Sequence, residues 1–305
     1  MVKKLLPTLL GAVALTAVAS LPSGATTAAQ TGTTEACELR SGAITSTGAV
    51  RVQNHVATKP PGLDVNRLES NKLFAGKNVR LVSMNYDGDY EDGSGRFGYM
   101  VFGNDMQQVK YSTDLEGNPD GSYIGKVGSG WAKYRIFESS DLWLGSYRRT
   151  TQYAIHNDGT LARWSVDSKQ VWHKTGTAKG YASFKSLALI SQTKTYDTFL
   201  ANTTNGRLYT IHIPTTAALK PILKIVRGSS WQTFESLQAT RCGNTGVVLL
   251  AIDKNTKSGY LYAVGHANGT KTVIKNLGKS KATFPDAVLF NWSLPTQFNP
   301  PPYGE

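Results

Sequence analysis

Three aromatic residues recur at intervals of 50 residues, and their type suits the binding of sugars. Trp131, Tyr181 and Trp231 each stand three residues before a second aromatic residue that opens a predicted strand. An aromatic ring can pack against the apolar C–H face of a sugar, while a nearby amide or carboxylate holds its hydroxyl groups. Asp158 and Asn205, which lie in predicted turns, are the candidates for that second role. The pattern predicts carbohydrate-binding sites at these positions.

An alternative interpretation assigns the same aromatic residues to the core. In that interpretation the three rings wedge between neighbouring repeat units, and the turn residues only make turns. The second aromatic series has the same period of 50 and fits the packing of innermost strands; its members are Tyr134, Phe184, Phe234 and Phe284. The sequence alone leaves both interpretations of the first series open.

The fixed period predicts a repeat architecture. Each unit shows about four short strand signals, and glycine turns such as Asn157-Asp158-Gly159 supply the positive φ that tight hairpins need. Four antiparallel strands per unit are typical of a propeller blade, and blades must stack because one alone cannot bury both of its faces. We therefore expect an all-β fold, a five-bladed β-propeller of four-stranded blades, over residues 37–294.

The two ends of the predicted propeller complement each other. Residues 37–75 supply strands two to four of a blade, whereas Phe284–Asn291 is a first strand without successors. A composite blade made from both would close the ring and remove free strand edges. The predicted blades are 76–128, 129–178, 179–228, 229–279, and 280–294 with 37–75. The first of these departs from the pattern through a longer acidic loop at residues 86–95.

The N-terminal segment indicates secretion. Residues 1–29 contain Lys3 and Lys4 followed by the apolar run Leu5–Ala19, as in a signal peptide. This run is too short to span a membrane, and no later segment resembles a membrane span. Residues 295–305 form a proline-rich tail. We expect an extracellular protein.

Cys37 and Cys242 are the two cysteines of the chain. In a secreted protein an even pair predicts a disulfide, and the blade assignment places these two residues on adjacent blades. The alternative is a pair of unpaired buried thiols.

The formal net charge is +12, with the basic residues spread along the chain. A solvated basic surface explains this charge. The more specific alternative is that the charge attracts the protein to an anionic envelope polymer. No basic stripe with interleaved aromatic residues stands out, so we expect no nucleic-acid partner.

Signals for catalysis, metals and cofactors are poor. The histidines are scattered along the chain without metal-ligand spacing, and there is no Gly-x-Ser-x-Gly motif. The acidic cluster Asp87, Asp89, Glu91 and Asp92 is confined to one loop and matches a calcium loop only weakly. We expect a protein that is not an enzyme and that has no catalytic residues, metal site or cofactor.

The repeat units resemble the tachylectin-type five-bladed propeller lectins. The resemblance rests on the unit of nearly 50 residues and on the opening Gly130-Trp131-x-x-Tyr134. It also rests on the third-strand pattern seen in Gly206-Arg207-Leu208-Tyr209 and Gly259-Tyr260-Leu261-Tyr262. The family implies binding of N-acetylated amino sugars at one equivalent site per blade, without catalysis or a cofactor.

Departures from the pattern reduce the number of expected sites to two or three. Lys281 replaces the aromatic residue in the composite blade, Gly76 lies near that position in the first blade, and Ser230 replaces the opening glycine of another. The favoured hypothesis is a secreted binder of amino-sugar glycans, in the cell envelope or the environment, that could target a larger secreted assembly. The alternatives are a protein-interaction propeller, with the tail as a docking segment, and a propeller glycoside hydrolase.

Overall fold

The structure is a computed structural model that describes residues 36–70, 72–90, 93–114, 119–216, 218–293 and 300–305. Residues 36–305 form one compact unit. The predicted signal peptide, residues 1–29, and residues 294–299 of the tail region lie outside the described residues. Within the described part of the chain, no helix is long and apolar enough to span a membrane.

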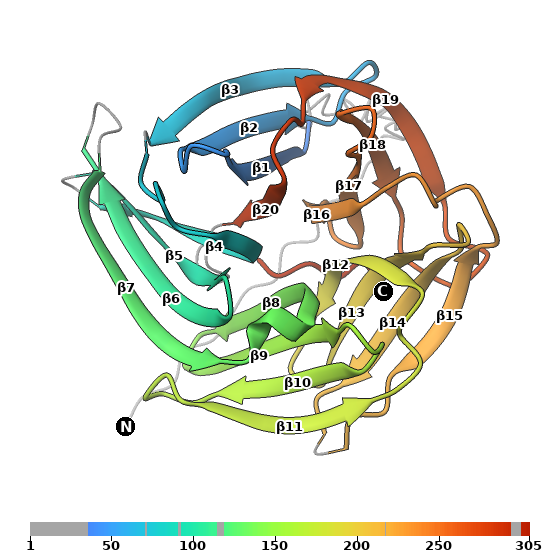
Figure 1. Cartoon of the computed structure of the whole chain (residues 1–305). Coiled ribbons are helices and arrows are strands. Elements are labelled where there is room, and N and C mark those ends of the chain that lie inside the picture. Colours follow the sequence, from blue (N-terminus) through green and yellow to red (C-terminus); the bar gives the residue numbers. More distant parts are fainter. Residues whose placement is uncertain (1–35, 71, 91–92, 115–118, 217, 294–299) are drawn as a thin grey trace, which may run out of the picture. The chain divides into compact units, whose positions relative to one another are not determined.

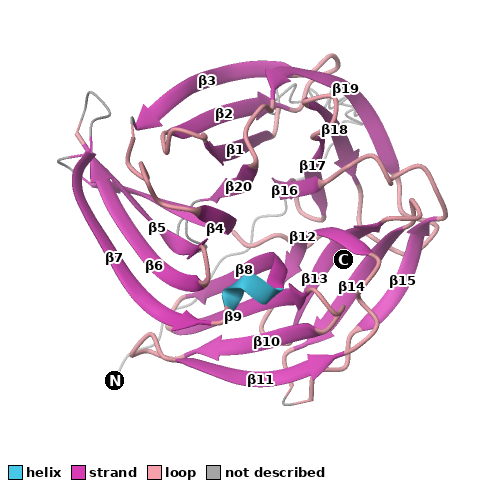
Figure 2. Ribbon diagram, in the orientation of Figure 1, coloured by secondary structure: helices cyan, strands magenta, loops and turns pink. Residues whose placement is uncertain are grey.

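The unit is all-β, with four-stranded groups arranged around a common centre (Figures 1 and 2). The first group is β4 (Val79–Tyr90), β5 (Gly93–Phe102), β6 (Asp105–Thr113) and β7 (Pro119–Ser129). The second is β8 (Tyr134–Leu144), β9 (Tyr147–His156), β10 (Leu161–Val166) and β11 (Trp172–Ala178). The third is β12 (Phe184–Gln192), β13 (Tyr196–Thr203), β14 (Leu208–Pro214) and β15 (Ile222–Arg227). The fourth is β16 (Ser236–Cys242), β17 (Gly246–Asp253), β18 (Ser258–Val264) and β19 (Ile274–Thr283). A short 3-10 helix, η1 (Trp131–Lys133), precedes β8.

Strands from both ends of the described chain share one sheet. β20 (Val288–Ser293) pairs antiparallel with β1 (Glu38–Ile44), and β2 (Val50–Val56) and β3 (Gly62–Ser70) follow outward. β20 also pairs with β4 in parallel, so that eight strands are hydrogen-bonded in the order β3-β2-β1-β20-β4-β5-β6-β7. The pairing of β20 with β1 removes the inner edge that β1 would otherwise expose.

The core lies between neighbouring sheets. One buried cluster joins Leu200 of β13 to Leu249 of β17, and another joins Tyr153 of β9 to Phe199 of β13. Neither sheet of such a pair could bury these side chains alone, as expected for stacked repeat units. The innermost strands β4, β8, β12, β16 and β20 line a narrow axial channel with a volume of about 40 Å³.

The acidic segment of the first group is not a loop along its whole length. The sequence predicts a loop over residues 86–95, but β4 extends to Tyr90 and β5 begins at Gly93. The two strands continue to pair beyond Tyr86, with Asp87 opposite Arg96 and Gly88 opposite Gly95. Main-chain pairing with a neighbouring strand overrides the low strand propensity of glycine and aspartate here. The side chains of residues 87–94, including the weak calcium-loop candidate, lie outside the described residues.

The predicted disulfide is confirmed. Cys37, directly before β1, is bonded to Cys242 at the end of β16, and their Cα atoms are 5.5 Å apart. The bond closes a loop with a sequence separation of 205 residues, and it links the sheet that contains β1 to the neighbouring β16–β19 sheet.

Removal of this disulfide should destabilise the protein strongly. The double variant Cys37→Ser/Cys242→Ser should lose about 5 kcal/mol of unfolding free energy, because a long loop regains conformational entropy in the unfolded chain. Urea denaturation would measure the loss, and addition of a reductant should destabilise the natural protein but not the double variant. An unchanged urea midpoint for the double variant would contradict a stabilising role.

Candidate functional site

The three aromatic residues singled out by the sequence are buried. The exposed fractions are 6% for Trp131, 3% for Tyr181 and 6% for Trp231. The Trp131 ring contacts Trp164 at a centroid distance of 5.4 Å, and the Trp231 ring contacts Tyr262 at 5.1 Å. These rings have too little free surface to pack against a sugar, so their burial favours the alternative interpretation as wedges between sheets.

A main-chain hydrogen bond fixes each wedge. The N–H of Trp131 donates to Asn104 O at 2.9 Å, and that of Tyr181 donates to Gly159 O at the same distance. The N–H of Trp231 donates to Gly206 O at 3.1 Å. In each case the acceptor lies in the hairpin turn between the second and third strands of the preceding sheet. The wedge position is therefore set by sheet-to-sheet packing.

Two further residues take the same place, although the repeat pattern does not assign them to it. The N–H of Phe74 donates to Gly48 O at 2.8 Å, and that of Phe284 donates to Lys257 O at 3.0 Å. Both rings are at least 98% buried. Phe284 is thus core, as the sequence predicts, but as a wedge before β20 rather than inside an innermost strand. Lys281, at the wedge position by spacing alone, lies instead in β19.

The two turn residues predicted to contact a ligand act within their turns. The Asp158 carboxylate accepts the N–H of Thr160 at 2.8 Å and lies 3.0 Å from His156 Nδ1. Hydrogen bonds, chiefly to Thr160, lower the pKa of Asp158. Asn205 Oδ1 accepts the Thr203 hydroxyl at 2.6 Å. Both side chains are exposed, but each lies beside a buried wedge rather than beside an open aromatic face.

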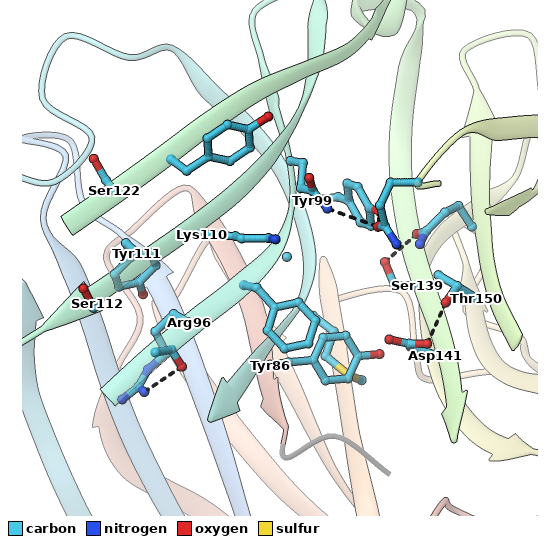
Figure 3. Close-up of a pocket in the computed structure, with 18 of the residues that line it drawn as sticks. Tyr86, Arg96, Tyr99, Lys110, Tyr111, Ser112, Ser122, Ser139, Asp141 and Thr150 are labelled. Carbon is cyan, nitrogen blue, oxygen red and sulfur yellow. Dashed lines mark hydrogen bonds between the residues drawn. The ribbon is translucent and has the colours of Figure 1, made fainter. Parts of the chain in front are cut away.

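The described residues do form a cavity elsewhere. It has a volume of about 520 Å³, is lined by residues of the β4–β7 and β8–β11 groups, and has none of the wedge residues in its lining (Figure 3). Its aromatic lining residues are Tyr86, Phe97, Tyr99, Tyr111, Tyr123 and Trp143. Its charged lining residues are Arg96, Lys110, Asp141 and Arg148. This volume and this mixture of aromatic and polar groups are those of a small-molecule site.

Asp141 is the carboxylate of this cavity. Its Oδ1 accepts hydrogen bonds from the Trp143 indole at 3.0 Å and from the Thr150 hydroxyl at 2.7 Å. Its Oδ2 receives a longer bond, 3.4 Å, from Arg148. The Arg148 guanidinium also lies 3.9 Å from the centre of the Trp143 ring. The carboxylate is thus held in a fixed orientation at the end of β8.

The opposite wall is formed by the β4–β7 group. The Tyr86 and Phe97 rings stack at a centroid distance of 5.0 Å, and Tyr86 lies beside Asp141 (Figure 3). Burial, followed by the charge of Asp141, raises the pKa of Tyr86 well above its usual value. The Lys110 side chain points into the cavity, and it has no ion-pair partner among the described residues. Tyr123 is 56% exposed at the rim.

Gln170 connects the two walls. It stands in the turn before β11 with φ of 63°, a left-handed conformation that is uncommon for a residue other than glycine. Its Oε1 accepts the Tyr99 hydroxyl at 2.9 Å and the Gln108 amide at 3.1 Å. Such backbone strain persists where the surrounding structure demands it, often at binding sites.

Other grooves between neighbouring groups are filled by the protein itself. Between β8–β11 and β12–β15, Arg149 forms an ion pair of 2.6 Å with the buried Asp197. Between β1–β3 and β4–β7, Arg96 and Glu69 form a buried pair at 2.5 Å.

Two grooves are filled by covalent or chain-end features. The disulfide lies between β16–β19 and β1, and residues 300–305 lie between β12–β15 and β16–β19. Among the grooves that the described residues outline, the one with Asp141 has a 520 Å³ cavity and no such plug.

Glu138 is a carboxyl group with a strongly raised pKa. It lines the axial channel and not the cavity that contains Asp141. Burial raises its pKa to about 8, although the Ser83 hydroxyl, which donates to it at 3.0 Å, acts in the opposite direction. The channel volume of about 40 Å³ is too small for a sugar ring. No group of three His, Cys, Asp or Glu side chains in the described ranges is arranged to hold a metal ion.

Sequence reasoning missed Asp141 and its neighbours because the repeat directs attention to positions where units agree. Asp141 has Ser191, Arg241 and Asn291 at successive intervals of 50 residues, and Tyr86 stands 55 residues before it. The residue type at the end of the innermost strand therefore differs from unit to unit. This difference is the sequence signal that could have located the cavity.

No protein-family model matches the chain, and no curated protein matches it. Among solved structures, the SapL1 lectin in complex with α-methyl fucoside is 13% identical, with a TM-score of 0.47 over 86% of this chain and 87% of that one. A fungal lectin from Aleuria aurantia, described as a six-bladed β-propeller with a novel fucose recognition mode, is 13% identical, with a TM-score of 0.47 over 80% of each chain. The periplasmic gluconolactonase of Pseudomonas aeruginosa is 9% identical, with a TM-score of 0.40 over 85% of this chain and all of that one. These likenesses assign neither a ligand nor a reaction to this chain.

A substitution at Trp231 distinguishes a wedge from a sugar platform. Trp231→Ala should lower the free energy of unfolding by about 3–5 kcal/mol, because it leaves a large cavity between two sheets. Trp231→Phe should retain most of the stability, and urea denaturation would compare the two. Full stability of Trp231→Ala together with loss of sugar binding would instead support the interpretation in which the Trp231 ring packs against a sugar.

Glu138 should make stability depend on pH. Its folded-state pKa is raised from about 4.5 to about 8, so its stabilising contribution is complete below pH 4.5 and is lost as the pH rises through 8. The free energy of unfolding should therefore fall over this range, and Glu138→Gln should reduce the slope. Glu235→Gln, at an ion pair with Lys185, is the control that should leave the slope in place. An unchanged slope in Glu138→Gln would show that other groups cause it.

Proposed function

We propose that this protein is a secreted carbohydrate-binding protein whose site is the cavity between the β4–β7 and β8–β11 groups. The observation that carries the proposal is the cavity itself, about 520 Å³ in volume, in which a fixed carboxylate faces aromatic rings. Sugars present both an apolar C–H face and hydroxyl groups, and a site of this composition satisfies both.

The aromatic residues at the opening supply the apolar contact. Tyr123 is exposed, and Phe97 and Trp143 are partly exposed. Asp141 accepts hydrogen bonds from hydroxyl groups, while Lys110 and Arg148 donate hydrogen bonds to hydroxyl oxygens. The long Arg148–Asp141 contact of 3.4 Å is the bond that a ligand hydroxyl would most readily share. Polar groups held in place before binding keep the entropic cost of association low.

The ligand class that we propose is a glycan containing an N-acetylated amino sugar. An acetamido group requires one hydrogen-bond donor, one acceptor and an apolar contact for its methyl group. The cavity lining includes the Gln108 and Gln152 amides together with the Met84 side chain. The tachylectin-type resemblance of the repeats supports the same ligand class and stays a prediction.

We infer that the propeller has five blades. The eight-stranded sheet divides naturally into β20-β1-β2-β3 and β4–β7, because its two halves are joined by a short parallel pairing at the centre. With the three four-stranded sheets, this division gives five blades. Because other grooves are filled, we propose one open site, fewer than the two or three expected from the repeats.

Binding is favoured over hydrolysis by the number of carboxylates. Asp141 is the only carboxylate among the described residues that line the cavity. Glycoside hydrolysis generally requires two carboxyl groups that flank the scissile bond. A role as the targeting part of a secreted assembly agrees with a glycan-binding site and a disulfide, and it stays a proposal.

Neutralisation of Asp141 should weaken binding. Asp141→Asn should reduce the affinity for amino-sugar oligosaccharides roughly 10- to 100-fold, because a charged acceptor bond contributes about 1.5–3 kcal/mol. A glycan array followed by calorimetry would measure the loss. Asp158→Asn, which changes an exposed turn carboxylate outside the cavity, is the matched control and should bind normally.

Two results would overturn the proposed site. One is normal binding by Asp141→Asn and Trp143→Ala, and the other is a blank array with the folded, disulfide-closed protein. In the second case a pull-down of secreted proteins would examine the protein-interaction alternative.

A further inference from the structure

The groove between the β12–β15 and β16–β19 groups corresponds to the proposed sugar cavity. Both grooves lie between neighbouring sheets, and they are two repeat units apart, a spacing of 100 residues. In this second groove lie residues Pro300–Glu305, which we call the tail segment. Figure 1 shows the end of the chain beside β12–β14. The tail segment thus occupies the place that is open in the first cavity.

The tail segment is held against β12 by an isolated antiparallel bridge between Tyr303 and Ser191 and by main-chain hydrogen bonds. Gln192 N–H donates to Pro302 O at 2.9 Å, and Gly304 N–H donates to Ile190 O at 2.7 Å. On the other side, Ala267 N–H donates to Gly304 O at 2.6 Å. A Cβ atom at position 304 would lie only 2.7 Å from Ile190 O. The groove therefore accepts an extended chain only if that chain is narrow at this point.

The Glu305 carboxylate adds side-chain contacts to the main-chain bonds. Its Oε2 lies 2.6 Å from His212 Nδ1 and accepts the Thr198 hydroxyl at 2.5 Å. The Tyr196 and His212 rings lie against each other at a centroid distance of 4.4 Å. Beyond the tail segment, a cavity of about 460 Å³ remains, and Lys224 also lines it. Among the described residues that line this cavity, Glu305 itself is the only acid.

The charge at the equivalent repeat position is reversed between the two grooves. Arg241 stands 100 residues after Asp141, and both lie near the end of an innermost strand, β16 and β8. The Arg241 guanidinium lies 5.9 Å from the centre of the Tyr303 ring. Without the tail segment, this groove would present Arg241, Lys224 and His212 and no carboxylate from its lining residues.

We propose that this groove is a second carbohydrate site, selective for sugars that carry a carboxylate, and that the tail segment fills it as an internal substitute for the ligand. The ligand carboxylate takes the place of Glu305 against His212 and Thr198. The sugar ring takes the place of the Tyr303 ring beside Arg241. This inference rests on the proposed function because it takes the ligand to be a carbohydrate. It does not require that the first cavity binds one.

Removal of the tail segment tests the proposal. The probe is an oligosaccharide of alternating N-acetylglucosamine and glucuronic acid, and its control is the same oligosaccharide with the carboxyl groups reduced to alcohols. Calorimetry on the chain without residues 300–305 should show one more site for the acidic probe than the full chain has. The added site should bind the reduced control at least tenfold more weakly.

A second variant keeps the full chain. In Gly304→Val the added side chain meets Ile190 O and should displace the tail segment without removing it. This variant should gain the same site, and Arg241→Gln in either background should abolish the gain. A folded protein that gains no site for the acidic probe in either variant overturns the proposal.

Two further measurements separate this inference from the proposed function. Asp141→Asn in the shortened chain should lose the first site and keep the second. If the shortened chain binds the acidic probe at the second groove but nothing binds at the first cavity, only the proposed function fails. The free peptide Pro-Pro-Pro-Tyr-Gly-Glu is the other probe. If it binds the shortened chain while the acidic oligosaccharide does not, the groove is a peptide site and the carbohydrate proposal fails.

Discussion

The hydrogen bond from each wedge residue to the preceding sheet is the contact on which the arrangement depends. A four-stranded sheet has two faces and cannot bury them alone, so every sheet must dock on its neighbours. The bonds from Trp131 N–H to Asn104 O and from Trp231 N–H to Gly206 O place one turn against the next sheet in the same way each time. The pairing of β20 with β1 and the Cys37–Cys242 bond then connect the last sheets to the first.

This constraint explains what the sequence could predict. The period of 50 residues, the hairpin turns and the cysteine pair follow from packing, so they predicted the four-stranded sheets, the sharing of one sheet by both ends and the disulfide. The same constraint explains why the predicted sugar-binding rings are buried: the regularly spaced rings of Trp131, Tyr181 and Trp231 are the ones that packing requires. Strict periodicity indicated core positions, because every unit packs against its neighbours in the same way.

The proposed function depends on the position at which the units differ. At the end of the innermost strand the side chains are Tyr86, Asp141, Ser191, Arg241 and Asn291. Their surroundings are set by contacts between distant segments, such as Gln170 with Tyr99 or residues 300–305 with β12, which no local pattern encodes. A one-residue difference at this position decides whether a groove holds an acid, a base or neither. The fold was therefore accessible from periodicity, whereas the cavity required the tertiary structure.

The number of open grooves also sets how such a protein can hold a glycan. Several weak sites on one ring would gain avidity on a repeating polymer, but one open cavity must bind by its own contacts. In the proposed second site, the tail segment would compete with a sugar as part of the same chain, which favours the tail segment over a ligand from solution. On the proposal above, a dilute monosaccharide should not displace it, whereas a dense polymer surface that presents carboxylates close to an occupied first cavity should. The second groove would then open in response to the density of the glycan on a surface and not to its concentration in solution.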